Sequence, residues 1–174
     1  TAPQFADSTS SANAATSNGS QASGDQQSAK INGGLNFDGS NDYLSAASPN
    51  LTTAATIEAW VKTDSGAKQE VASLQSDAIV LRAHDDSTTG PSFTVKSGGS
   101  YYPISTSELT IGSWYHLVGI YSSGSLKLYL NGTEVSSGSA TGTLDSGATN
   151  NIGVHQNGSA NPFDGLMDEV RVSN

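Results

Sequence analysis

Apolar and polar residues alternate in short segments along most of the chain between residues 35 and 172. In the segment 55–62, every second residue is apolar: Ile57, Ala59 and Val61. This alternation predicts a β-strand, because successive side chains of a strand point to opposite faces of its sheet. The other set of positions includes the bulky Trp60, so we expect both faces of this strand to be covered.

Similar patterns predict many short strands, with turn residues between them and no convincing helix. The expected strands are 35–37, 43–44, 55–62, 71–74, 78–83, 93–96, 101–104, 114–121, 125–130, 133–135, 151–154 and 166–172. Asn131-Gly132 favours a tight hairpin turn, because both of its central residues adopt positive φ. The fold class expected is all-β, a two-sheet antiparallel jelly-roll sandwich.

Residues 1–34 have a different composition, rich in Ser, Ala, Asn, Gln and Gly. Phe5 and Ile31 are the only large apolar residues there, and so little apolar surface cannot offset the entropy lost on ordering. We therefore expect 1–34 to be a loop segment of the same domain, with the jelly roll formed by 35–174.

The amino-acid composition argues against several classes of binding partner. A length of 174 residues suits one domain, and a net charge of −9 argues against binding nucleic acid or anionic membranes. No stretch of roughly 18 apolar residues occurs, so membrane insertion is not expected. The absence of cysteine excludes disulfides and thiolate metal sites, and it favours an extracellular or cell-surface location.

Four motifs occur in order from about Gly33 to Val172: GGLNFDGSNDYL, TIEAWVK, GSWYHLVGIYSSGSLKLYLNGTEV and IGVHQNGSANPFDGLMDEVRV. In this order and spacing they resemble the laminin-G-like domains of the concanavalin A-like lectin/glucanase superfamily. The resemblance implies a jelly roll that serves as a binding or adhesion module of secreted or surface proteins. The family's aromatic opening strand is not matched at the start of the chain. We expect either that the chain was cut before this strand or that a neighbouring segment or subunit donates it.

The resemblance also implies a structural calcium ion, because related jelly rolls often bind calcium between their first and last strands. Calcium takes six to eight oxygen ligands. The expected ligands are Asp38, Asp42 and Asp168, with Asp164 a weaker candidate. Alternatively, Asp38 and Asp164 stabilise tight turns, and Asp168 pairs with a basic residue such as Arg171.

Sugar binding is the second candidate chemistry, since aromatic faces stack on sugar rings while polar groups bind hydroxyls. The candidate ligand-binding residues lie in polar loops and beside a glycine-serine loop: Tyr101, Tyr102, His84, Asp85, His155 and Asn157. Alternatively, one of the two consecutive tyrosines packs in the core. We interpret Trp60 and Trp114, which belong to strand motifs, as packing residues.

Catalysis is not expected, because the closely spaced carboxylates of the superfamily's glucanases have no match in the chain. Zinc is not expected either, because the three histidines are scattered along the sequence. The leading hypothesis is a non-catalytic recognition or adhesion module that binds a glycan or a surface protein. The alternatives are a structural subunit or spacer of a surface fibre or pilus, and a carbohydrate-binding module of a polysaccharide-degrading enzyme.

Overall fold

The computed structural model describes residues 4–5, 13–86 and 90–174. Its strands are β1 (Gln4–Phe5), β2 (Ala15–Asn18), β3 (Gln26–Ser28), β4 (Gly33–Asp38), β5 (Tyr43–Ser45), β6 (Ala54–Thr63), β7 (Gln69–Leu74), β8 (Ile79–His84), β9 (Ser92–Ser97), β10 (Ser100–Ser105), β11 (Tyr115–Ser122), β12 (Ser125–Leu130), β13 (Thr133–Ser139), β14 (Asn151–Ile152) and β15 (Asp164–Ser173). A 3-10 helix at Ser23–Asp25 is the only helix in these ranges, and it is far too short to span a membrane.

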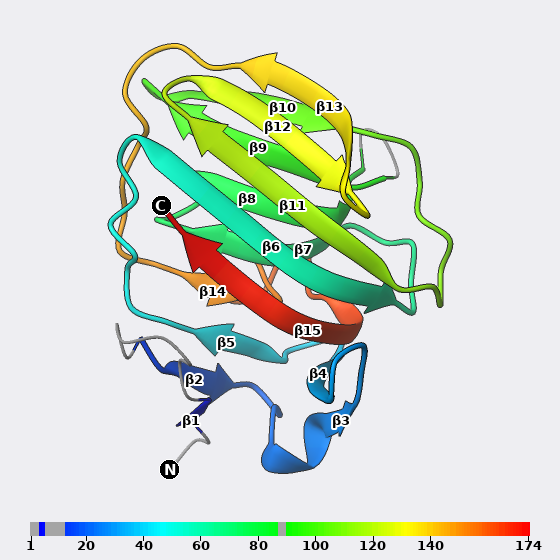
Figure 1. Ribbon diagram of the computed structural model, residues 1–174. Helices are drawn as coiled ribbons and strands as arrows, with labels where there is room; N and C mark the ends of the chain where they lie inside the picture. The colour runs from blue at the N-terminus through cyan, green and yellow to red at the C-terminus, as the bar shows by residue number, and fades with distance from the viewer. Residues whose placement is uncertain (1–3, 6–12, 87–89) are drawn as a thin grey trace.

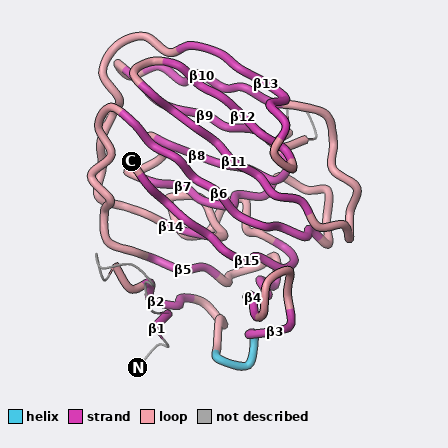
Figure 2. Tube along the Cα trace, in the orientation of Figure 1, coloured by secondary structure: helices cyan, strands magenta, loops and turns pink. Residues whose placement is uncertain are grey.

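Two antiparallel sheets lie face to face (Figures 1 and 2). The first, sheet A, has eight strands in the order β1-β2-β5-β14-β7-β8-β9-β10. The second, sheet B, has seven strands in the order β13-β12-β11-β6-β15-β4-β3. The prediction of an all-β, two-sheet antiparallel sandwich is therefore confirmed.

The hydrophobic core lies between the sheets, where alternate residues of each strand point inward. In β6 every second residue is buried, and the intervening residues, Trp60 included, are only half-buried. The expectation that both faces of this strand are covered is thus wrong: its outer face lies at the surface. Strands β7, β8 and β9 differ, because their residues are buried almost throughout.

Asn131 and Gly132 join β12 to β13 with positive φ at both residues, 50° and 81°. The Asn131 side-chain oxygen also accepts a hydrogen bond from the His116 backbone N–H at 2.9 Å. The predicted hairpin turn is thereby confirmed, and it is tied to the neighbouring strand β11.

The N-terminal segment differs from the expected loop, because it contributes β1, β2 and β3. Strand β2 pairs with β5, and β3 pairs with β4, so backbone hydrogen bonds to existing strands order a segment that has little apolar surface. Strand β1 pairs with β2, so this chain itself extends the edge of sheet A. The remainder of the predicted loop, at 1–3 and 6–12, lies outside the described residues.

Candidate functional site

A buried ion pair links β7 and β8 on the outer face of sheet A. Glu70 and Arg82 are directly opposite in the strand register. Arg82 donates to Glu70 Oε1 from Nε at 3.2 Å and from Nη2 at 3.1 Å, and Asn161 Nδ2 donates to the same oxygen at 3.0 Å. The Glu70 side chain is fully buried. Burial raises the pKa of Glu70, while the Arg82 charge opposes that rise.

The network continues from Arg82 toward the loop that follows β8. Arg82 Nη1 lies 3.4 Å from Asp85 Oδ2, and the Ser92 hydroxyl donates to the same oxygen at 2.7 Å. Lys68 Nζ lies 3.7 Å from the other carboxylate oxygen of Asp85. Arg82 on β8 therefore lies between two carboxylates, Glu70 of β7 and Asp85 of the following loop.

Asp77 is the third carboxylate on this face, and it lies in the turn between β7 and β8. The Tyr101 hydroxyl donates to Asp77 Oδ2 at 3.1 Å, and His155 Nε2 lies 3.5 Å from Asp77 Oδ1. Lys96 Nζ lies 5.3 Å from the centre of the Tyr101 ring. Burial and the neighbouring Asp77 charge raise the pKa of Tyr101. A tyrosine, a histidine and a carboxylate from three distant segments thus meet here.

Several of the residues predicted to bind a ligand lie on this outer face. Tyr101 and His155 contact Asp77. Asp85 contacts Arg82, the partner of Glu70, whose ligand atom lies within 4.8 Å of those of Asp77 and His155. Asn157 lies in the same loop as His155 and donates its backbone N–H to His155 Nδ1 at 3.4 Å.

Tyr102 and His84 lie elsewhere. Tyr102 follows Tyr101 in β10, so its side chain points to the opposite face. It packs against the core, and its hydroxyl is 2.8 Å from Thr141 Oγ1. His84 is fully buried, with Nε2 3.2 Å from Thr63 Oγ1.

Glu70, Asp77 and Arg82 were not predicted as site residues. Arg82 stands inside the largely apolar segment IVLRAH, whereas Glu70 and Asp77 lie in the more polar segments QEVASL and QSDA. A charged residue inside an apolar strand segment is unusual, because a buried charge needs a partner. That pattern was the available sequence indication of this network.

The predicted calcium ligands Asp38 and Asp42 lie together in the turn between β4 and β5. Asp38 Oδ1 accepts the backbone N–H groups of Ser40 at 2.9 Å and Asn41 at 3.1 Å. Burial acts to raise the pKa of Asp38, but these N–H groups outweigh it and lower the pKa. The Ser20 hydroxyl donates to Asp42 Oδ1 at 2.7 Å.

Asp168, the third predicted calcium ligand, is not brought to this turn. In the β4–β15 register Asp38 lies opposite Asp164, and Asp168 is further along β15 by about 13 Å at the usual rise of a strand. The backbone N–H of Ile31 donates to Asp168 Oδ2 at 2.6 Å. Asp164 is the nearer carboxylate: burial, Asp64 and Asp38 all raise its pKa.

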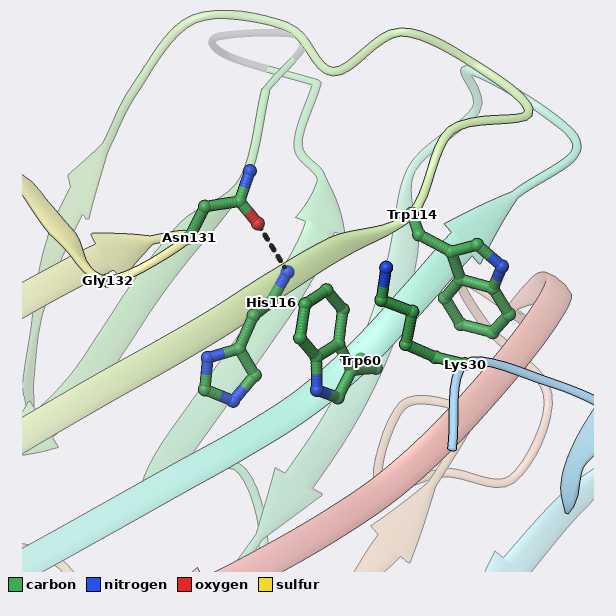
Figure 3. A pocket seen from close by; sticks show the side chains of 6 residues that line it. All are labelled: Lys30, Trp60, Trp114, His116, Asn131 and Gly132. Carbon is green, nitrogen blue, oxygen red and sulfur yellow. Dashed lines mark hydrogen bonds between the residues drawn. The ribbon is translucent and has the colours of Figure 1, made fainter. Parts of the chain in front are cut away.

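A cleft of about 510 Å³ lies on the outer face of sheet B, lined by Lys30, Trp60, Trp114, His116, Asn131 and Gly132 (Figure 3). The rings of Trp60 and His116 are 5.1 Å apart, centre to centre. Lys30 Nζ lies 4.7 Å from the centre of the Trp60 ring. The two tryptophans interpreted as packing residues therefore line an open cleft, although Lys30 and His116 already contact the Trp60 ring.

Among the described residues, one group of side chains has the composition and spacing of a metal site. Its members are Glu70, Asp77 and His155, whose potential ligand atoms all lie within 4.8 Å of one another. The group lies in the network on sheet A, away from the acidic turn at Asp38 and Asp42.

Solved structures with the same fold cover nearly all of this chain. Domain 4 of AbnA, an extracellular GH43 arabinanase from Geobacillus stearothermophilus solved with arabinotriose, matches with a TM-score of 0.75 and 20% identity, over 98% of this chain and 92% of that one. The carbohydrate binding module CBM66 from Bacillus subtilis matches with a TM-score of 0.53 and 14% identity, over 92% and 95%.

Domains LG4-5 of the mouse laminin α1 chain match with a TM-score of 0.64 and 20% identity, over 80% of this chain and 40% of theirs. A comparison with curated proteins gives no match. The family model described as the concanavalin A-like lectin/glucanases superfamily, of the laminin-G type, matches residues 38–174. The chain therefore belongs to the laminin-G-like branch of the concanavalin A-like lectin/glucanases superfamily.

Proposed function

We propose that this chain is a non-catalytic carbohydrate-binding module, and that its glycan binds on the outer face of sheet A around Tyr101. The observation that carries the proposal is the position of the Tyr101 ring, which is 52% exposed and stands beside Asp77 and His155. An exposed aromatic ring can stack on a sugar while neighbouring carboxylate and imidazole groups bind its hydroxyls.

The similar structures support this choice. The AbnA domain was solved with arabinotriose, and CBM66 is itself a carbohydrate binding module. A short neutral oligosaccharide offers many hydroxyl groups, which donate and accept hydrogen bonds. The mixture of Asp85, Lys96 and His155 on this face supplies both kinds of partner.

Recognition suits this face better than hydrolysis. A glycosidase needs two carboxyl groups flanking the scissile bond, about 5 Å apart in retaining enzymes. Glu70 and Asp77 have ligand atoms within 4.8 Å of each other, but the Glu70 side chain is fully buried and bonded to Arg82. A buried carboxyl group cannot reach a glycosidic bond, so we assign this pair no catalytic role.

We further propose that the module acts outside the cell, as a recognition or adhesion unit of a secreted or surface protein. The similar AbnA domain belongs to an extracellular arabinanase. The net charge of −9 also keeps the module from adhering nonspecifically to anionic surfaces.

Substituting Tyr101 tests the location of the glycan. On an array that includes arabino-oligosaccharides, we expect the wild-type protein to bind at least one glycan. Tyr101→Ala should then lose about tenfold in affinity, or about 1.4 kcal/mol, because the stacking surface is gone. Isothermal titration with the glycan identified on the array measures the loss.

Trp114→Ala is the matched control, since it removes an aromatic ring from the cleft on the opposite side of the sandwich, just before β11. It should leave the affinity unchanged. If Trp114→Ala abolishes binding and Tyr101→Ala does not, the glycan binds in the cleft on sheet B. An array with no bound glycan would argue against carbohydrate binding altogether.

We also propose that calcium binds in the turn that holds Asp38 and Asp42, with Asp164 as the third carboxylate in place of Asp168. The Ser20 hydroxyl, which contacts both Asp38 and Asp42, and the register that places Asp164 opposite Asp38 support this assignment.

Saturating calcium, at about 100 times its dissociation constant, should stabilise EDTA-treated protein by about 2.7 kcal/mol. The melting temperature of wild-type protein should rise, and that of Asp42→Asn should not; an unchanged wild-type melting temperature would exclude the site.

A further inference from the structure

We propose that Glu70, Asp77 and His155 form a binding site for a divalent metal ion of the zinc class. The residues come from β7, from the turn before β8 and from the loop between β14 and β15. Each offers one ligand atom, and these atoms all lie within 4.8 Å of one another. The scattered histidines gave no indication of zinc in the sequence, because this site exists only once the sheet and the loop are in place.

The spacing suits a small tetrahedral ion. Zinc binds nitrogen and oxygen at about 2.0–2.2 Å, which places tetrahedral ligand atoms about 3.4 Å apart. His155 Nε2 and Asp77 Oδ1 are already 3.5 Å apart. The ligand atom of Glu70 lies within 4.8 Å of both of these atoms, and it would move closer to them on binding the ion.

Glu70 supplies an independent indication of a missing partner. Its Oε2 atom is buried and has no hydrogen-bond partner among the described residues. Buried polar atoms are nearly always bonded, and a buried anionic oxygen without a partner is costly. A cation at this position would satisfy that oxygen.

The neighbouring groups hold both carboxylates in a suitable orientation. Arg82 and Asn161 donate to Glu70 Oε1, and Tyr101 donates to Asp77 Oδ2. Such outer partners commonly orient the ligands of metal sites.

Among the described residues Glu70 Oε2 has no hydrogen-bond donor. Asp77 Oδ1 accepts only a long hydrogen bond of 3.5 Å from the Ser73 hydroxyl and lies 3.5 Å from His155 Nε2. These two oxygens are therefore the ones offered to the ion.

His155 must present a lone pair on Nε2 to the ion, so its proton must lie on Nδ1. In the structure Nδ1 accepts the Asn157 N–H at 3.4 Å, a long hydrogen bond. Metal binding would exchange this weak contact for a coordinate bond. The His155 loop is at the surface, so the exchange requires no change in the core.

The ligand set favours zinc over calcium. Calcium prefers six to eight oxygen ligands, whereas zinc binds imidazole nitrogen and carboxylate oxygen and can take three protein ligands with water as the fourth. The positive ion would also neutralise part of the negative charge of Glu70 and Asp77. The ion would share Asp77 and His155 with the proposed glycan site, so zinc binding is measured in the absence of glycan.

The test is a titration of EDTA-treated protein with zinc chloride. Binding is measured by calorimetry and by the ¹⁵N chemical shifts of the histidine rings. We expect saturable binding of one zinc ion per chain, with a large shift of the His155 Nε2 signal. His155→Asn should weaken binding by at least tenfold. Tyr101→Phe, which removes only the hydroxyl bonded to Asp77, should weaken it by about tenfold.

His116→Asn is the matched control, because His116 lies on the opposite sheet with Nε2 3.4 Å from Glu58. It should bind zinc as the wild type does. Equal losses in His155→Asn and His116→Asn, or no saturable binding by wild type, would overturn the proposal. Because His155 is at the surface, its variant should fold normally, and a normal melting temperature without metal confirms this. Glycan binding is read separately, so a failure of either proposal is distinguishable from a failure of the other.

Discussion

Replacing Phe37 by alanine is expected to lower the free energy of unfolding by about 3–5 kcal/mol, as for other buried phenylalanines. Phe37 in β4 is 1% exposed and Phe163, just before β15, is fully buried. Their rings meet edge to face with centres 5.9 Å apart, a favourable arrangement for two aromatic rings. Gly153 packs directly against Phe37, because a Cβ at position 153 would lie only 2.5 Å from the Phe37 ring.

Urea denaturation of Phe37→Ala, followed by tryptophan fluorescence, measures this loss. The matched control is Ile111→Ala, which truncates an apolar residue that is 49% exposed and should change the stability little. The double variant Phe37→Ala/Phe163→Ala should lose less than the sum of the two single losses, because the partners share one contact. A loss below about 1 kcal/mol in Phe37→Ala would show that this part of the core does not pack as described.

Arg82→Met is expected to have an effect of similar size, a loss of about 3–5 kcal/mol near neutral pH. The variant keeps an apolar stem on β8 but removes the guanidinium that faces the fully buried Glu70. An uncompensated buried charge then remains. Glu70→Gln/Arg82→Met should recover part of the loss, because it removes that charge as well.

The effect should depend on pH in a defined direction. Burial already raises the pKa of Glu70, and Arg82 opposes that rise, so removing Arg82 raises the pKa further. Folded Glu70 then keeps a proton that the unfolded chain releases. The loss should be smallest below the ordinary glutamate pKa, at about pH 4, and should grow as the pH rises through the raised value.

Denaturation curves for Arg82→Met and wild type at several pH values test this dependence. Lys127→Met is the matched control, because it breaks the exposed pair between Lys127 and Glu134 on sheet B. Exposed ion pairs contribute little, so this control should show neither a large loss nor the same pH dependence. A pH-independent loss in Arg82→Met would mean that its cause is altered packing and not the charge on Glu70.

The strands of the core could be predicted because their pattern is local. The alternation in β6 and the Asn131-Gly132 turn each need only a few consecutive residues. The alternation does not say what covers the second face of a strand. Trp60 was therefore expected to be covered, whereas it lines an open cleft.

The network on sheet A depends on contacts between distant residues. Glu70 meets Arg82 through the pairing of β7 with β8, and it meets Asn161 across 91 positions of sequence. The β4–β15 register likewise decides that Asp164 and not Asp168 faces Asp38. Register depends on the pairing of whole strands, so residue spacing alone could not place these carboxylates.

The positions of β14 and β15 have a consequence for biosynthesis. These last two strands do not lie at the edges of the sheets: β14 is between β5 and β7, and β15 is between β4 and β6. Strands β2 and β5 therefore cannot pair into the rest of sheet A before β14 has left the ribosome, and β3 and β4 cannot pair into the rest of sheet B before β15 has. Pairing over such a distance is slow, and chains emerge N-terminus first. A nascent chain that stops before β14 would carry its first five strands as an unattached tail, accessible to chaperones and proteases.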